Sequence, residues 1–234
     1  MNELEQQIHD EIGKKGPIPF SRFIELALYA PNLGYYEKQR EVGMRGDFYT
    51  SVSVGSLFGE LLAFQTARWL DELKGPVQLL EAGAHDGRLA RDILSFLRDW
   101  RPEVYERCEL LLLEPSIMRQ GWQQETLAEF KGKVKWISDE VADFRGVFIA
   151  NELLDAFPVE KIRWDGKRQT WLQMGVGMEE GGLVEVILGE SLFKADPLEG
   201  SVPDGCVMVE NVGAVNYWGK ICSAMQEGRA VALD

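Results

Sequence analysis

The sequence predicts an α/β protein with a parallel sheet, preceded by a helical cap and interrupted by an antiparallel β-meander. Short apolar runs of strand length alternate with amphipathic helical segments between residues 77 and 150, the pattern of a parallel sheet with helical crossovers. After residue 159 the runs are instead separated by turn residues, which indicates hairpins. The 234 residues are 45% hydrophobic and 27% charged, an ordinary globular composition that suits one elaborated domain.

Residues 1–75 are expected to form the helical cap and a lid on the substrate side. Apolar residues recur every four positions from Leu4 to Ile12, which predicts a first amphipathic helix. Ser21 is expected to cap a second helix, which stops before Pro31. A longer third helix is expected to use one apolar face, made of Leu57, Phe58, Leu61, Leu62, Gln65 and Trp69.

Residues 76–234 are expected to form the sheet domain, with the β-meander inserted at about 159–190. Asp165-Gly166 has the composition of a hairpin turn within this meander. A further helix and a returning strand are expected near the end of the sequence. The strands expected in the parallel sheet are Val77–Glu81, Leu110–Leu113, Val134–Ile137 and Val147–Ala150, and the returning strand is Arg229–Leu233.

The charge balance limits the classes of partner. Lysine and arginine number 25 against 38 acidic residues, a formal net charge of −13, which argues against a nucleic-acid partner. An acidic surface suits a basic or arginine-bearing protein segment, although acidity also serves solubility alone. The sequence leaves the oligomeric state open.

Cysteine spacing, hydropathy and the first residues of the sequence indicate whether to expect a metal site, a membrane span or a targeting segment. The three cysteines form no C-x-x-C pair, so neither a disulfide framework nor a metal site is expected. No apolar run approaches the roughly 20 residues that a membrane span needs. The polar, acidic start resembles neither a secretory signal nor a transit peptide, so we expect a cytoplasmic protein.

A glycine-containing turn follows the first strand of the expected sheet and is the first candidate cofactor site. The segment Leu79-Leu-Glu-Ala-Gly-Ala-His-Asp-Gly-Arg88 places Glu81, Gly83, His85 and Gly87 where that strand meets a helix. Glycine allows the backbone to approach a nucleotide closely. Glu114, followed by Pro115, ends the next strand, where a carboxylate can accept hydrogen bonds from both ribose hydroxyls of an adenosine.

Two cofactor classes fit this arrangement. A nicotinamide dinucleotide would normally be held by G-x-G-x-x-G, but glycines occur here only at positions 83 and 87. Glu81 would repel a pyrophosphate but could help hold the amino-acid end of a sulfonium cofactor. Taken alone, the segment is equally consistent with a glycine-rich turn beside an incidental acidic residue.

Several longer motifs occur in order around this turn. The sequence resembles the MidA-type protein arginine methyltransferases, the family of the mitochondrial complex I assembly factor, over nearly its whole length. The segments that carry the resemblance are Gly16-Pro-Ile-Pro-Phe-Ser-Arg-Phe-Ile-Glu-Leu-Ala-Leu-Tyr29, Gly34-Tyr-Tyr36, Gly46-Asp-Phe-Tyr-Thr50, Leu57-Phe-Gly-Glu60, Asn151-Glu-Leu-Leu-Asp-Ala-Phe-Pro158, Glu210-Asn-Val-Gly-Ala214 and Trp218.

The resemblance implies a Rossmann-like class I methyltransferase sheet that binds S-adenosyl-L-methionine and methylates arginine in a protein. It adds Asp47 and Thr50 to the cofactor residues, with Asp47 closing over the cofactor unless it is only a turn residue. The family's turn usually reads Glu-x-Gly-x-Gly-x-Gly, whereas His85 stands at the middle glycine. We therefore expect His85 to reshape the turn and weaken binding.

The sequence stops at Val231-Ala-Leu-Asp234, where such proteins continue with Tyr-Gly and further strands. The C-terminal end of the sheet domain, including a closing antiparallel hairpin, is therefore expected to be incomplete.

The candidate catalytic residues follow the fourth expected strand. An arginine acceptor stays protonated, with a pKa above about 12, so carboxylates must orient its guanidinium and accept the proton it loses. Asn151, Glu152 and Asp155 are the candidates, although Asp155 could instead cap a helix and Glu152 could be a solvated side chain. A catalytically weakened binding or assembly protein is the main alternative function, and a NAD-dependent oxidoreductase is a distant one.

Overall fold

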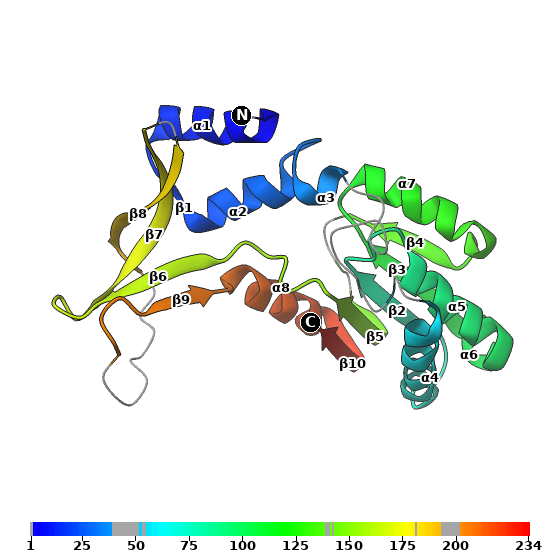
Figure 1. Ribbon diagram of the computed structural model, residues 1–234. Coiled ribbons are helices and arrows are strands. Elements are labelled where there is room, and N and C mark those ends of the chain that lie inside the picture. Colours follow the sequence, from blue (N-terminus) through cyan, green and yellow to red (C-terminus); the bar gives the residue numbers. More distant parts are fainter. Residues whose placement is uncertain are drawn as a thin grey trace. The chain divides into compact units, whose positions relative to one another are not determined.

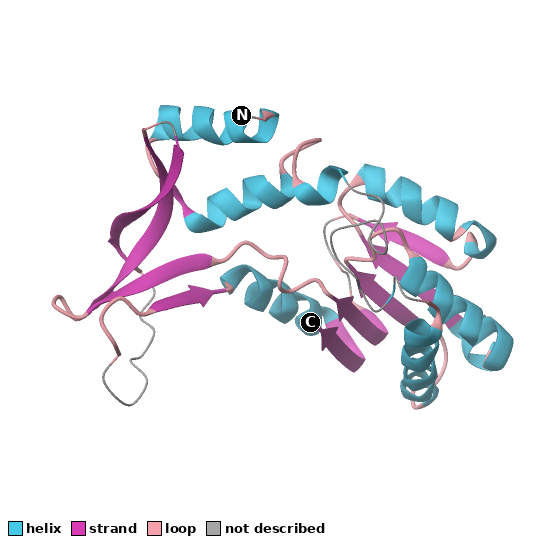
Figure 2. Cartoon of the chain, viewed as in Figure 1, coloured by secondary structure: helices cyan, strands magenta, loops and turns pink. Residues whose placement is uncertain are grey.

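A computed structural model divides the chain into two compact units, each built from two stretches of sequence (Figures 1 and 2). The first unit contains residues 1–39 and 156–216, and the second contains residues 40–155 and 217–234. These units are discontinuous in sequence, unlike the two consecutive domains expected from the sequence. The structure describes residues 2–38, 52, 55–138, 141, 143–180, 182–192 and 202–234.

The second unit is a parallel five-stranded sheet with helices. Its strand order is β10-β5-β2-β3-β4, and every adjacent pair is parallel. This arrangement confirms the predicted α/β sheet. The elements are α4 (Leu57–Asp71), β2 (Val77–Ala82), α5 (Arg88–Trp100), α6 (Pro102–Arg107), β3 (Cys108–Leu113), α7 (Ile117–Thr126), the short 3₁₀ helix Ala128–Phe130, β4 (Val134–Ile137), β5 (Phe144–Asn151) and β10 (Met225–Leu233).

The central strands are apolar on both faces because both faces are covered. On β5, Val147 and Ile149 belong to a large core that α4, α5 and α6 complete. Phe148 and Ala150 point the opposite way, into a smaller core that includes Ile221 of α8 (Val212–Ala224). Successive residues of a strand alternate between faces, so this continuous apolar run supplies two cores.

The predicted apolar face of α4 is only partly correct. The buried face consists mainly of small residues, among them Gly59, Ala63 and Ala67, and it packs closely against α5. Leu57 and Leu61 are instead 68% and 63% exposed. Small side chains let two helix backbones approach closely, so the face of α4 that contacts α5 carries small residues. The larger apolar residues that the pattern predicted for this face lie partly outside it.

The first unit combines short helices with an antiparallel sheet of order β1-β7-β6-β9, in which β8 also pairs with β7. Strands β6, β7 and β8 form the predicted meander. Helix α8 begins in this unit and continues into the other. The remaining elements are α1 (Glu3–Lys15), β1 (Ile18–Pro19), α2 (Phe20–Tyr29), α3 (Tyr35–Lys38), β6 (Glu160–Asp165), β7 (Thr170–Glu179), β8 (Gly182–Glu190) and β9 (Val207–Glu210).

The first unit unites the N-terminal helices with the meander through β1. Ile18 and Pro19, just before α2, pair with Val176 and Gly175 of β7. Ser21 does not cap α2, since the helix begins at Phe20. The Ser21 hydroxyl instead donates to Glu160 Oε1 at 2.5 Å. Among the described residues, no helix is both long and apolar enough to cross a bilayer.

Candidate functional site

The turn from β2 to α5 keeps the backbone conformation that its glycines favour. Gly83 and Gly87 have φ angles of +73° and +84°, in the left-handed region. A Cβ added to Gly83 would lie 2.9 Å from Leu153 Cδ1, in the loop after β5. Gly83 therefore meets both a conformational and a steric requirement, and the turn packs directly against the neighbouring loop.

His85 adopts a left-handed φ of +46° despite its side chain. The expectation that it forces the turn out of the glycine-type conformation is therefore not supported. Its ring lies near that of Trp122, with 5.8 Å between ring centroids, and its Nδ1 is 4.0 Å from Asp86 Oδ1. A non-glycine residue in this region carries a conformational cost of about 1–2 kcal/mol, so the turn stores strain.

Glu81 is the most perturbed carboxyl group near the turn. Glu81 is 2% exposed, and its Oε2 has no hydrogen-bond partner among the described residues. Burial, assisted by repulsion from Asp86, raises the pKa of Glu81 to about 8. Burial opposes ionisation of Asp86 too, but the neighbouring His85 and Arg88 side chains lower its pKa below the ordinary value. The two acidic groups therefore differ in charge state near neutral pH.

Glu114, immediately after β3, is also buried at 2% exposure, but its carboxylate is held by several donors. Oε1 accepts from the Ser116 backbone N–H at 2.9 Å and from Arg119 Nε at 3.0 Å. Oε2 accepts from Gln123 Nε2 at 3.3 Å. A carboxylate has about four acceptor positions, so this group is oriented and still retains room for a further donor. The adjoining Pro115 is exposed.

The candidate catalytic residues lie at the end of β5. Asn151 is its last residue, and the exposed Glu152 follows with a φ of +48°. The Glu152 N–H donates to the Leu233 carbonyl at 2.7 Å, which fixes the backbone beside β10. Asp155 is exposed, and no described helix begins there, so it does not serve as a helix cap.

Parallel register brings these strand ends to one edge of the sheet. Ala82 pairs with Leu113 on one side and with Ala150 on the other. This places the expected residues of the β2 turn and the end of β3 beside the β5 loop, at the edge where open α/β sheets bind ligands. Asp47 and Thr50 lie outside the described residues.

Three residues at this edge were not anticipated: Arg119, Gln123 and Asp234. The Asp234 carboxylate accepts from the Leu153 N–H at 2.9 Å and the Leu154 N–H at 3.3 Å, which holds the β5 loop. The sequence does contain one signal for Gln123: it lies one helical turn before Leu127, a buried core residue. A polar residue on the apolar face of a helix usually has a buried hydrogen-bond partner.

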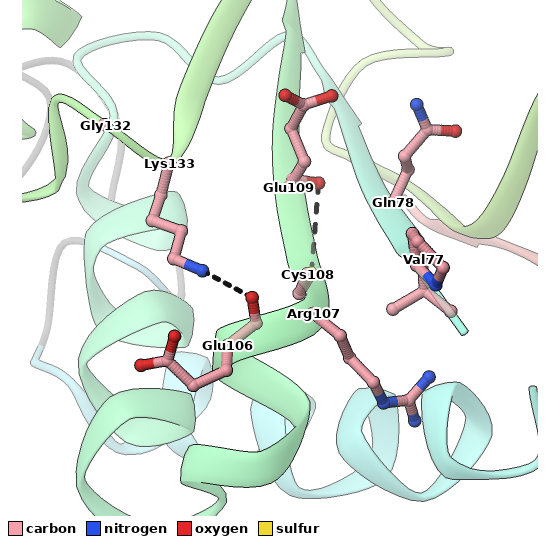
Figure 3. Close-up of a pocket in the computed structure, with 9 residues that line it drawn as sticks. Val77, Gln78, Glu106, Arg107, Cys108, Glu109, Gly132 and Lys133 are labelled. Atoms are coloured by element: carbon pink, nitrogen blue, oxygen red, sulfur yellow. Dashed lines mark hydrogen bonds between the residues drawn. The ribbon is translucent and has the colours of Figure 1, made fainter. Parts of the chain in front are cut away.

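A cavity of about 440 Å³ lies at the opposite edge, beside the amino ends of β2 and β3 (Figure 3). Its cationic side chains already serve backbone carbonyls. Lys133 Nζ donates to the carbonyls of Tyr105 and Glu106, near the end of α6, and Arg107 donates to that of Leu70. The cationic side chains of this cavity therefore cap backbone carbonyls, and we place the candidate site at the carboxyl edge of the sheet.

The fold is that of a class I methyltransferase domain, and at its carboxyl edge an acidic glycine turn follows one strand and a carboxylate follows the next. Residues 61–228 match the family described as "Putative S-adenosyl-L-methionine-dependent methyltransferase". The match covers well over half of the chain. The chain belongs to this family.

Curated relatives agree with the family assignment. A Caenorhabditis elegans protein named "Protein arginine methyltransferase NDUFAF7 homolog, mitochondrial" is 27% identical over 77% of this chain and 47% of its own length. The Mus musculus protein named "Protein arginine methyltransferase NDUFAF7, mitochondrial" is 31% identical over 65% of this chain and 41% of its own. The chain thus spans less than half the length of these relatives. Their names overturn the expectation of a cytoplasmic location, because they are mitochondrial proteins.

Solved structures give the same fold. A Burkholderia thailandensis protein bound to S-adenosyl-homocysteine superimposes with a TM-score of 0.82 at 28% identity, covering 98% of this chain and 61% of that one. A native structure from the same organism superimposes with a TM-score of 0.80. The predicted methyltransferase sheet and the predicted family are confirmed.

Proposed function

We infer that this chain is an S-adenosylmethionine-dependent methyltransferase whose cofactor binds at the carboxyl edge of β2 and β3. The observation that carries this proposal is Glu81, a buried carboxyl just before a glycine turn, whose Oε2 has no hydrogen-bond partner within the part of the chain that the structure describes. A buried polar group of this kind normally has a partner. The cofactor's α-ammonium group would supply one, and the resulting charge pairing would compensate the ionised carboxylate.

The neighbouring residues fit the other parts of such a ligand. Gly83 and Gly87 keep side chains away from the turn, so a ligand can approach the backbone. Glu114 is fixed in orientation by three donors and has acceptor capacity left for a ribose hydroxyl. The same edge therefore offers complementary groups for the amino-acid and ribose ends of one S-adenosyl compound.

We propose arginine in a protein substrate as the methyl acceptor. The curated relatives are named protein arginine methyltransferases, and the net charge of −13 suits a basic polypeptide. Glu152 and Asp155 are exposed carboxylates beyond the end of β5, beside the candidate cofactor turn. Paired carboxylates can hold a planar guanidinium by several charge-assisted hydrogen bonds.

In the proposed mechanism these residues align the acceptor. The cofactor supplies a methyl group already activated on a sulfonium, so the chain itself needs no activating metal. Glu152 and Asp155 orient one guanidinium nitrogen and accept the proton released from it, with the Asn151 amide as an additional hydrogen-bonding group. Alignment of reacting atoms is the main contribution required of the protein for such a displacement.

The test is transfer of a radiolabelled methyl group to arginine-containing peptides and to matched peptides with lysine. We expect transfer to arginine alone, reduced at least tenfold by Glu152→Gln or Asp155→Asn, while affinity for S-adenosyl-homocysteine changes less than about tenfold. The matched control is Glu106→Gln, which removes an exposed carboxylate that lies on α6. Equal loss of binding and transfer would show that Glu152 and Asp155 serve the cofactor or the fold instead.

A further inference from the structure

Gln123 of α7 connects three neighbouring elements at the carboxyl edge. Its Nε2 donates to the His85 carbonyl at 3.0 Å in the β2 turn and to Glu114 Oε2 at 3.3 Å after β3. Its Oε1 accepts from Trp136 Nε1 of β4 at 2.9 Å. The residue is 0% exposed, so each of these bonds is made without competition from water.

The orientation of the Gln123 amide follows from the chemistry of its partners. An indole N–H is only a donor, so Oε1 must face Trp136. The amide nitrogen must then face the carbonyl of His85 and the carboxylate of Glu114, both of which are acceptors. One rotamer satisfies all three contacts, and a flipped amide would satisfy none of them.

Both acceptors need such support. His85 has a strained positive φ, and the Gln123 bond fixes its carbonyl. Glu114 is held on Oε1 by Ser116 and Arg119, whereas Gln123 holds its Oε2. Helix α7 also lies close to the turn itself, since a Cβ added to Gly87 would be 3.4 Å from Gln123 Cα. Removing the amide would release the turn and the carboxylate together.

We propose that Gln123 is a positioning residue that couples the glycine turn to the Glu114 carboxylate and thereby sets affinity for the S-adenosyl cofactor. The inference rests on the proposed function, because it assumes that both elements contact one ligand. Gln123 acts through His85 and Glu114 and need not touch the ligand. Its contribution is preorganisation, which raises affinity by removing an ordering cost from the binding step.

The decisive variant is Gln123→Glu, which keeps the shape and the acceptor for Trp136 but replaces the donor with an acceptor. Calorimetric titration with S-adenosyl-homocysteine at pH 8 should show affinity reduced about tenfold to a hundredfold, the range for a lost hydrogen bond to a charged group. Gln124→Glu adds the same charge at an exposed position of the same helix and should leave affinity within twofold.

The pH dependence separates positioning from a general loss of structure. The introduced carboxyl would face the Glu114 carboxylate, with Arg119 and His85 nearby, and two adjacent carboxylates resist ionising together. At lower pH the introduced group holds a proton and donates to Glu114 again. The affinity of Gln123→Glu relative to Gln124→Glu should therefore recover as pH falls from 8 to 5.5. A defect that is constant over this range would contradict the proposal.

Trp136→Phe provides a second test if Gln123→Glu does not fold. It removes the donor that orients the amide and should weaken S-adenosyl-homocysteine binding severalfold, with Trp69→Phe as a control on α4. Unchanged affinity in Trp136→Phe or Gln123→Glu, together with a clear loss in Glu114→Ala, would overturn the role of Gln123 and leave the site intact. Failure of the unmodified protein to bind would instead refute the proposed function.

Discussion

Replacing Glu81 with glutamine should make the ligand-free protein more stable at neutral pH. The Glu81 pKa is raised from 4.5 to about 8, so between these values the folded state binds a proton that the unfolded state has released. Stability then falls as pH rises through this window, by about 1.4 kcal/mol per pH unit, and the loss is complete only above the folded pKa. Glutamine keeps the shape and cannot ionise, so it removes this dependence.

The full effect is at most about 5 kcal/mol, because the window spans roughly three and a half pH units. The assay is urea unfolding at pH 5.5, 6.5 and 7.5, followed by tryptophan fluorescence, with Glu106→Gln as the control for charge. We expect the difference in unfolding free energy between Glu81→Gln and the unmodified protein to grow with pH by about 1 kcal/mol per unit. A difference that is independent of pH would refute a protonated, buried Glu81.

Four further substitutions, the last of them a control, test separate parts of the structure. Glu114→Ala should weaken S-adenosyl-homocysteine binding at least tenfold in calorimetry, since a lost charge-assisted hydrogen bond is worth about 1.5–3 kcal/mol; unchanged affinity would exclude Glu114 from the site. His85→Gly should relieve the positive φ and stabilise the fold by about 1 kcal/mol in urea unfolding, whereas weaker binding of S-adenosyl-homocysteine would identify His85 as a ligand contact. Gly59→Ala should destabilise the fold by about 1–3 kcal/mol, because its Cβ would lie 2.6 Å from Asp92 Cβ between α4 and α5. Gly13→Ala should instead be neutral or stabilising, because no atom of the described residues lies within 4 Å of a Cβ added there.

Local patterns were sufficient to predict most of the strands, the parallel arrangement of the main sheet and the β-meander, but not β1 or β9. The apolar runs that became β2, β3 and β5 are short and bounded by turns, so their period and length identified them. The carboxyl-edge position of Glu81 and Glu114 followed from this, because parallel strands end at a common edge. The positions of these candidate residues therefore depended only on chain order and strand assignment.

Features that depend on tertiary contact could not be predicted in the same way. The buried face of α4 uses small residues because α5 approaches closely, which the apolar period of α4 alone did not indicate. Pro19 joins a sheet through Gly175, more than 150 residues away in the sequence. Gln123 becomes important only because α7 places it between the His85 carbonyl and Trp136. Each of these outcomes was decided by a partner remote in sequence.

The most direct measurement of the central claim is calorimetric titration with S-adenosyl-homocysteine at pH 7 in two buffers of different ionisation enthalpy. If the ligand's ammonium pairs with Glu81, that carboxyl must ionise, so binding at one site per chain should release close to one proton. Glu81→Gln should bind more weakly and release none. Absence of binding by the unmodified protein, or binding with the same proton release in Glu81→Gln, would contradict the placement of the cofactor at this edge.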